Sequence, residues 1–557
     1  MLRLLIAMLC ALVAAGTSAV HAKRTVCTIT VNSTNEREAF RRHLPEKDFE
    51  FVELVERGRR DWLATACKQQ VKCDVLVISG HFNGNDFFSD QLTVAEHLPV
   101  AEMERASCSD SCPGLFSQLK EVYMFGCDSL NGERMQGVAA EVARTLVTGG
   151  QSRAEAERIA QSLAEAHSES NRDVMRRVFV NTPAVYGFSS VAPVGAVAGP
   201  ILSRYLQTAS PGDIGTGRPN PKLLAHFSAH AMSMTTGLRD NEARSTQRAQ
   251  VCRFVDDRLD VAQKLAFIHD LVRANPGQAR FHLDRIERFV AALSDADRAS
   301  SAVAQTLEKI RADQQAGDRF LGFARNTDTA STRARMNAVA RSLGWLSEAD
   351  YRAETVKLLG DLVAAQRVPS TADVDQVCKL NRDDAYSGEL DGIRRAAGST
   401  TAHAAALACL GSAEHHDLML QALASPSERD VEVAEVYFHH RPIAAADELR
   451  AVTGAIAKLS RTDAQVRALN ALARQPVADG EGLDELARMF SLAENVAVQR
   501  AIASVFIRTD HRAIATPELL RVFREHRKAG SGNDVIDVLI RRLERAMSLA
   551  GAQARSS

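Results

Sequence analysis

Two short apolar runs in the first quarter of the chain constrain its fold more than any other feature. The run 75–78 reads Val-Leu-Val-Ile and leads into Ser79-Gly80-His81, and the run 122–125 reads Val-Tyr-Met-Phe and leads into Gly126-Cys127. Short runs rich in Val, Ile, Tyr and Phe, bounded by Gly and polar residues, are typical of buried strands in a parallel sheet. Functional side chains gather at the carboxyl ends of such strands. We therefore expect His81 and Cys127 to lie side by side.

The region around these runs alternates strand patterns with helix patterns. We expect helices over 36–43, 60–70, 134–146 and 153–178, and strands over 26–31, 49–54, 73–79, 122–126 and 184–189. Strands that alternate with helices indicate an α/β domain with a mostly parallel sheet. We assign this domain to residues 23–209.

The rest of the chain is expected to be helical. Residues 210–222 are dense in Gly and Pro and predict a linker or long loop. Residues 223–380 have Ala, Leu and Arg at helical spacing, and residues 381–550 add a weak repeat of about 33 residues that begins near Val433, Val466 and Gln499. Helix pairs with this period stack into a HEAT-like solenoid, and an irregular helical bundle is the alternative.

The N-terminus predicts export. Arg3 precedes an apolar stretch over 4–16, and small residues follow up to Ala22. This is the pattern of a cleaved secretory signal peptide, which we assign to residues 1–22. The apolar stretch is shorter than the roughly 20 residues that a membrane span requires, and no later segment is long and apolar enough. We expect a periplasmic or secreted protein without a membrane span.

The cysteines support the same compartment. The chain has ten, and loss of residues 1–22 would leave nine. In an exported protein an odd number indicates a free thiol beside disulfides, and we expect that thiol to be Cys127. For the other eight, Cys108 could pair with Cys112, Cys378 with Cys409, two of Cys27, Cys67 and Cys73 with each other, and the third of these with Cys252.

The two strand ends resemble a known family. A strand that ends at His81, followed about 45 residues later by a strand that ends Gly126-Cys127-Asp128-Ser129, is similar to the caspase-like cysteine peptidases, which include caspases, legumain, gingipains, separase and CHAT proteins. The resemblance covers about the first third of the chain. It implies a three-layer α/β fold and hydrolysis of a protein or peptide substrate by a Cys127/His81 dyad.

The resemblance also implies roles for the residues around the dyad. Cys127 would attack the peptide carbonyl, and His81 would protonate the leaving amine and then activate water. Backbone N–H groups of Cys127 and of a residue just after His81 would hold the oxyanion. The expected oxyanion and substrate cleft contains Phe82, Gly84, Gly126, Asp128, Ser189 and Ser190. Asp86, Asp90 and Asp128 are close enough in sequence to form an acidic pocket for Arg or Lys, but the favoured interpretation is that they are solvated surface carboxylates.

Other functions are less favoured by the sequence. A formal net charge of -1 leaves no basic surface of the kind that binds nucleic acid. The histidines lack an HExxH motif and the cysteines lack CxxC spacing, so no metal or other cofactor is predicted. Family members usually have Gly directly after the catalytic His, whereas Phe82 stands here. This difference favours the alternative, a non-catalytic periplasmic scaffold or adaptor whose helical repeats bind a protein partner.

Overall fold

A computed structural model describes most of the chain. The described residues are 23–54, 62–89, 96–133, 137–239, 241–242, 244–364, 366–394, 397–475, 483–509, 511–528 and 534–553. The predicted signal peptide, residues 1–22, and Asp90 lie outside them. The chain divides into two compact units, one formed by residues up to Thr327 together with Ser342–Gly344, and the other by Asp328–Arg341 and the residues from Trp345 onward.

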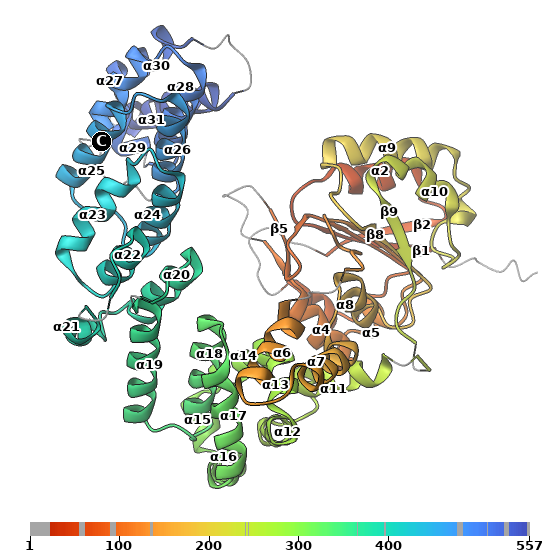
Figure 1. Cartoon of the computed structure of the whole chain (residues 1–557). Helices are drawn as coiled ribbons and strands as arrows, with labels where there is room; N and C mark the ends of the chain where they lie inside the picture. Colours follow the sequence, from red (N-terminus) through yellow and green to blue (C-terminus); the bar gives the residue numbers. More distant parts are fainter. Residues whose placement is uncertain are drawn as a thin grey trace, which may run out of the picture. The chain divides into compact units, whose positions relative to one another are not determined.

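The first unit is built on a six-stranded sheet (Figure 1). In spatial order the strands are β2 (Phe49–Glu53), β1 (Arg24–Thr30), β3 (Val75–Ser79), β7 (Glu121–Phe125), β8 (Ala184–Phe188) and β9 (Met232–Thr235). The first five are the strands that the sequence predicted, and they run parallel. β9 pairs antiparallel with β8. It lies in the region we expected to be helical, and its Met-Ser-Met-Thr sequence alternates apolar and polar residues over too few positions to indicate a strand.

Helices cover both faces of this sheet, which gives the unit three layers. One face is covered by α2 (Asn35–His43) and α9 (Gly195–Thr208), and the other by α3 (Trp62–Lys68), α4 (Val100–Cys108), α5 (Pro113–Phe116) and α8 (Asn171–Val178). Within β3, Val75 and Val77 pack under the first group, whereas Leu76 and Ile78 pack under the second. Both faces of the strand are buried, which explains why its sequence is a continuous apolar run.

A second, small sheet follows β3 directly. It consists of β4 (His81–Phe82), β5 (Asp86–Phe88) and β6 (Leu98–Pro99), paired antiparallel. The sequence predicted that His81 ends a strand, but the structure shows that it begins a new one. Strands of two or three residues carry too little periodicity to be recognised in a sequence.

The Gly- and Pro-rich segment 210–222 is anchored to the first unit. Ile214 is fully buried under the sheet, and its carbonyl oxygen accepts a hydrogen bond from the Arg24 guanidinium. The buried Glu121 carboxylate at the start of β7 accepts the N–H groups of Thr216 (3.0 Å) and Gly217 (3.1 Å). The segment is therefore a long loop that packs on the sheet, with a 3-10 turn, η1 (Pro211–Asp213), and the start of α10 (Pro221–His226).

Most of the remaining helices of the first unit pack against one another, and α11 packs on α4. The helical stretch predicted over 153–178 is two helices, α7 (Arg153–His167) and α8, because Ser170 and Asp173 form a capping box that starts α8. The others are α6 (Gly137–Thr148), η2 (Ser228–His230), α11 (Ser245–Val255), α12 (Val261–Ala274), α13 (Pro276–Phe281), α14 (Leu283–Ala291), α15 (Asp295–Ala299), α16 (Ser301–Ala312) and α17 (Gln314–Asn326).

The second unit is a helical repeat with two rows of helices (Figure 1). In one row α20 (Thr371–Leu380), α22 (Thr401–Cys409), α24 (Glu428–His440), α26 (Thr462–Ala473), α28 (Val496–Ile507) and α31 (Val535–Gln553) pack in succession. In the other row α23 (Ala413–Leu423), α25 (Ala446–Ala457), α27 (Asp484–Leu492) and α30 (Pro517–Glu525) do so. The remaining elements are α18 (Ala330–Ser342), α19 (Glu348–Val363), η3 (Ser387–Glu389), α21 (Leu390–Arg394) and α29 (His511–Ile514).

The predicted sequence repeat matches these rows. Val433, Val466 and Gln499 lie on α24, α26 and α28, which are consecutive members of the first row. Three positions further on, Leu469 and Ile502 are both fully buried in the shared core. The helical repeat is therefore confirmed. None of the described helices has the length and apolarity needed to cross a membrane.

Four disulfides cross-link the described residues, as the cysteine count predicted. The possible pairs Cys378–Cys409 and Cys27–Cys73 are confirmed. The predicted local pair Cys108–Cys112 is wrong, because the structure contains Cys108–Cys252 and Cys67–Cys112. The predicted bond from Cys252 to Cys27, Cys67 or Cys73 is wrong for the same reason. Cys108 ends α4, which packs against α11, whereas Cys112 precedes α5 and bonds to α3. Four disulfides are typical of proteins that fold in an oxidising compartment.

Candidate functional site

The carboxyl ends of β3 and β7 meet at the candidate site. These neighbouring parallel strands pair up to Ser79 and Phe125, and the Gly80 N–H then reaches the Phe125 carbonyl oxygen at 3.5 Å. The two glycines that follow lie in contact: a methyl group added to Gly126 would come within 3.1 Å of the Gly80 carbonyl oxygen. His81 and Cys127 are the next residues on the two strands, and both are partly exposed. The parallel register thus brings the backbones of the two predicted residues to neighbouring positions.

His81 is held by the hairpin of β4 and β5. It pairs with Phe88 across the hairpin, and the two rings lie 5.6 Å apart. The adjacent Phe82 is buried against Phe87, with ring centroids 4.6 Å apart, and this apolar contact anchors the hairpin in the core. The Phe82 side chain is therefore part of the core, and the turn of the hairpin contains Gly84 at a positive φ of 93°.

Cys127 is the free cysteine of the described residues. The backbone N–H of Ala192 donates a hydrogen bond to its sulfur at 3.3 Å. The Cys127 N–H itself makes no hydrogen bond to any residue in the described part of the chain. A partly exposed sulfur beside an unused backbone donor is the local arrangement that a thiol nucleophile with an oxyanion site would need.

The loop after Cys127 is fixed against the end of β8. The Asp128 N–H donates to the Ser190 carbonyl oxygen (2.8 Å), and the buried Ser129 hydroxyl accepts the Phe188 N–H (3.1 Å). Asp128 has a φ of 56°, a left-handed conformation that is uncommon for a residue with a side chain. Hydrogen bonds on both sides hold it there, and they also place Ser189 and Ser190 on the exposed surface beside the cysteine loop.

Asn171 links the cysteine loop to the hairpin of His81. Its side-chain amide donates to the Asp128 carbonyl oxygen at 2.9 Å. Its side-chain oxygen lies 3.5 Å from the place where a Cβ on Gly84 would stand. Asn171 is the first residue of α8, so one helix end contacts both halves of the site. Nothing in the sequence indicates this role, because Asn is common at helix starts.

Glu36 is a second residue that the sequence analysis missed. Although it is charged by type, it is only 2% exposed, and its carboxyl lies beside the side chains of Ser33 and Ser79. Burial raises the pKa of Glu36 above the ordinary value. Ser33 lies against Gly195, where an added methyl group would come within 1.8 Å of the Ser33 hydroxyl oxygen. The Glu36 carboxyl therefore sits between the end of β3 and the start of α9, directly behind the segment that contacts Cys127.

Of the three carboxylates that could form an acidic pocket, Asp86 and Asp128 lie among the described residues and Asp90 does not. Asp128 accepts a hydrogen bond from the Asn131 side chain (3.2 Å), and Asp86 is partly exposed at the start of β5. No group of three or more His, Cys, Asp and Glu side chains among the described residues is arranged to hold a metal ion.

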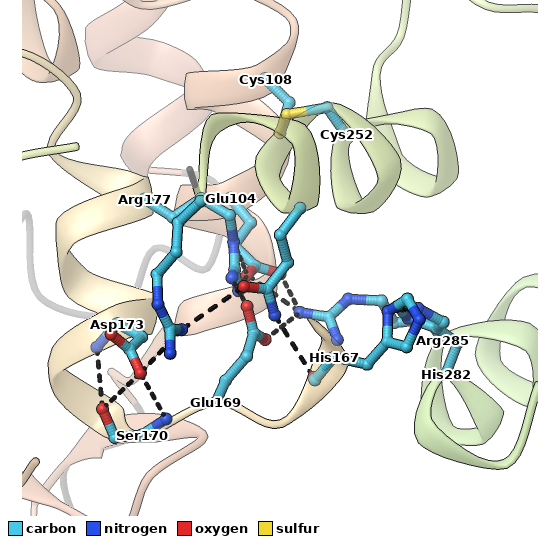
Figure 2. A network of polar contacts seen from close by, with 12 residues as sticks. Glu104, Cys108, His167, Glu169, Ser170, Asp173, Arg177, Cys252, His282 and Arg285 are labelled. Atoms are coloured by element: carbon cyan, nitrogen blue, oxygen red, sulfur yellow. Dashed lines mark hydrogen bonds and ion pairs between the residues drawn. A yellow bond between two sulfur atoms is a disulfide. The ribbon is translucent and has the colours of Figure 1, made fainter. Parts of the chain in front are cut away.

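A buried ion network lies elsewhere in the first unit (Figure 2). Glu104 of α4 and Glu169 both pair with Arg177 of α8 and with Arg285 of α14. Burial opposes the ionisation of Glu104, but Arg177 and Arg285 outweigh it and lower its pKa to about 2. His282 and His167 lie beside the network with ring nitrogens 3.3 Å apart, and burial lowers the pKa of His282 to about 3.

The contacts of this network indicate a structural role. Together with the nearby Cys108–Cys252 disulfide, it joins the helices that cover the sheet, α4 and α8, to α11 and α14 from later in the chain (Figure 2). Its charges neutralise one another at close range, so we assign it to stability and not to chemistry on a substrate.

The chain matches no family model, no curated protein and no solved structure in the three comparisons made with known proteins.

Proposed function

We propose that the first unit is an exported, caspase-like cysteine peptidase that hydrolyses peptide bonds with Cys127 and His81. The observation that carries the proposal is the position of Cys127. It is unpaired and partly exposed in a chain whose other described cysteines form disulfides, and it follows the strand next to the one that leads into His81. An exported protein that keeps one thiol reduced and accessible at a sheet edge has a chemical use for it.

The proposed reaction has two steps. His81 takes the proton of the Cys127 thiol, and the sulfur attacks the peptide carbonyl carbon. The amine then leaves with that proton from His81, and a thioester remains. His81 then removes a proton from water, which attacks the thioester and releases the acid and the Cys127 thiol. The Ala192 N–H supports a sulfur that carries negative charge, because hydrogen bonds to charged acceptors are stronger.

The oxyanion would be held by backbone N–H groups. We propose the unused N–H of Cys127 as one donor. The second would come from the turn between β4 and β5, where the Gly84 N–H makes no hydrogen bond within the described residues. This assignment replaces the Gly that family members have directly after the catalytic His, a position that Phe82 takes in this chain.

Three variants test the proposal. Cys127→Ser and His81→Ala should each abolish cleavage of a mixed peptide library, measured by mass spectrometry, and Cys127→Ser should also abolish labelling by electrophilic peptide probes. His226→Ala is the matched control, since His226 is exposed on α10 and takes no part in the site. Cleavage that persists in Cys127→Ser would remove the proposal.

The second candidate is a non-catalytic scaffold, and the helical repeat favours it. Two-row helical repeats commonly present an extended surface to protein partners. A thiol titration separates the two functions: the peptidase needs about one reactive thiol per folded chain, whereas a scaffold does not require Cys127 to react. The same dyad would also serve acyl transfer, which product analysis of the library reaction would reveal.

A further inference from the structure

Three valines are exposed in the segment that contacts Cys127. Val191 is 72% exposed, Val194 62% and Val197 44%. The other exposed large hydrophobic residues in the described part of the chain stand singly, at Val147, Val368, Leu418, Leu492 and Leu549. Single exposed hydrophobic residues are normal, but a group of three indicates a surface that is covered by something. We name Val191, Val194 and Val197 the valine rim.

The segment that carries the valine rim contacts the Cys127 sulfur through its backbone. Ala192, between the first two valines, donates its N–H to the Cys127 sulfur. Val194 and Val197 belong to one helical turn at the start of α9, where the Val197 N–H reaches the Val194 carbonyl oxygen at 2.8 Å. The buried Ala198 and Gly199 fix this turn, and an added methyl group on Gly199 would come within 2.9 Å of Asn35 of α2. Val194 and Val197 therefore stay exposed because the other side of this helical turn packs in the core.

The chemistry of this segment favours an apolar occupant. Residues 189–199 contain no charged side chain, so they offer no ion pair to an acidic or basic group. Burying an apolar side chain against valine removes apolar surface of both partners from water, which is favourable. Because Ala192 contacts the sulfur, an occupant of the valine rim lies next to the bond that Cys127 would attack.

We propose that the substrate is a peptide segment with aliphatic or aromatic side chains beside the cleaved bond, and that the valine rim receives these side chains. This inference rests on the peptidase function proposed above and adds the substrate class. It replaces the basic preference that an acidic pocket around Asp86 and Asp128 would give.

The test compares the reaction of Cys127 with three matched probes. These are peptidyl acyloxymethyl ketones that differ only in their side chains: Val, Leu and Phe in the first, Lys and Arg in the second, and Asp and Glu in the third. The rate of modification of Cys127 is followed by intact mass. The apolar probe should react at least about tenfold faster than either charged probe.

Substitutions in the valine rim check that it causes the preference. The double variant Val191→Ser/Val197→Ser keeps Val194, the residue directly before α9. It should react about tenfold more slowly with the apolar probe, and its reaction with the charged probes should not be slower. Val147→Ser, which changes a 43% exposed valine on α6, is the control and should leave all rates unchanged. Iodoacetamide, which needs no recognition, should modify Cys127 equally fast in all three proteins.

Two unfavourable results have different meanings. If a charged probe reacts fastest and His81→Ala abolishes its reaction, the peptidase stands and the apolar preference is wrong. The preference is equally wrong if the double variant reacts with the apolar probe as fast as the natural chain does. If no peptide probe reacts and His81→Ala leaves the iodoacetamide rate unchanged, the peptidase function itself fails.

Discussion

Replacement of Glu104 by Gln should strongly destabilise the first unit. The Glu104 side chain is 4% exposed, as is that of Arg177, with which it pairs. Glutamine keeps the shape but removes the charge, which leaves the buried guanidinium of Arg177 short of one counter-charge. Removal of one partner of a buried ion pair costs about 3–5 kcal/mol of unfolding free energy.

The pKa of Glu104 gives a similar magnitude. Its lowering from the ordinary 4.5 to about 2 corresponds to about 3 kcal/mol at neutral pH. Since the folded-state pKa is depressed, this contribution is fully present above pH 4.5 and is lost as the pH falls toward about 2. Two routes therefore predict that Glu104→Gln lowers the unfolding free energy by about 3 kcal/mol at pH 7.

The neighbouring residue provides a matched control. Arg105 lies on the same helix and pairs with Asp257 at 2.5 Å, but the two side chains are 38% and 48% exposed. An exposed pair contributes about 0–1 kcal/mol, so Arg105→Gln should have little effect. Urea unfolding with intact disulfides, monitored by hydrogen exchange of the α4 and α8 amides, would measure the unfolding free energy of both variants. A Glu104→Gln effect within about 1 kcal/mol of the Arg105→Gln effect would refute the reasoning.

Three further predictions concern acid, the site backbone and the disulfides. Because burial lowers the pKa of His282 from 6.5 to about 3, the neutral ring stabilises the fold above pH 6.5, and this stabilisation is lost as the pH falls toward 3. Urea unfolding should show that the unfolding free energy falls by about 2 kcal/mol between pH 7.5 and pH 5, and that His282→Gln makes this fall smaller. Gly126→Ala should lower the unfolding free energy by about 1–3 kcal/mol in a melting experiment and reduce peptide cleavage, because its new Cβ would lie 2.7 Å from that of Phe82. Gly137→Ala is the control: its new Cβ would meet nothing within 4 Å, so it should change neither stability nor cleavage. Removal of the Cys108–Cys252 bond, which spans 144 residues, by Cys108→Ser/Cys252→Ser should lower the unfolding free energy by about 2–5 kcal/mol, and an unchanged urea midpoint would contradict a stabilising role.

Patterns that extend over five or more residues were predictable from the sequence. The strands β3, β7 and β8 are largely apolar runs because both of their faces are buried. The helical repeat is recognisable because the same positions recur in the same row. The odd number of cysteines predicted one free thiol, and the place of Cys127 at the end of an apolar run made it the candidate, which the structure confirms.

Features that depend on which distant segments meet were not predictable. The sequence could not show that Cys108 pairs with Cys252, because a separation of three residues between Cys108 and Cys112 suggested a local bond, while the packing of α4 on α11 decides the true partner. The strands β4, β5, β6 and β9 are too short to have a period.

The sequence by itself indicated an α/β region with a mostly parallel sheet in the N-terminal part, helices after it, and one free thiol at the end of a strand. The tertiary structure alone decided what surrounds that thiol: the Ala192 N–H on its sulfur, Asn171 across the two loops, Glu36 behind them and the exposed valines beside them. The reason is physical. Strands and helices follow from local periodicity, whereas a site is made of contacts between segments whose separation in the chain carries no periodic signal.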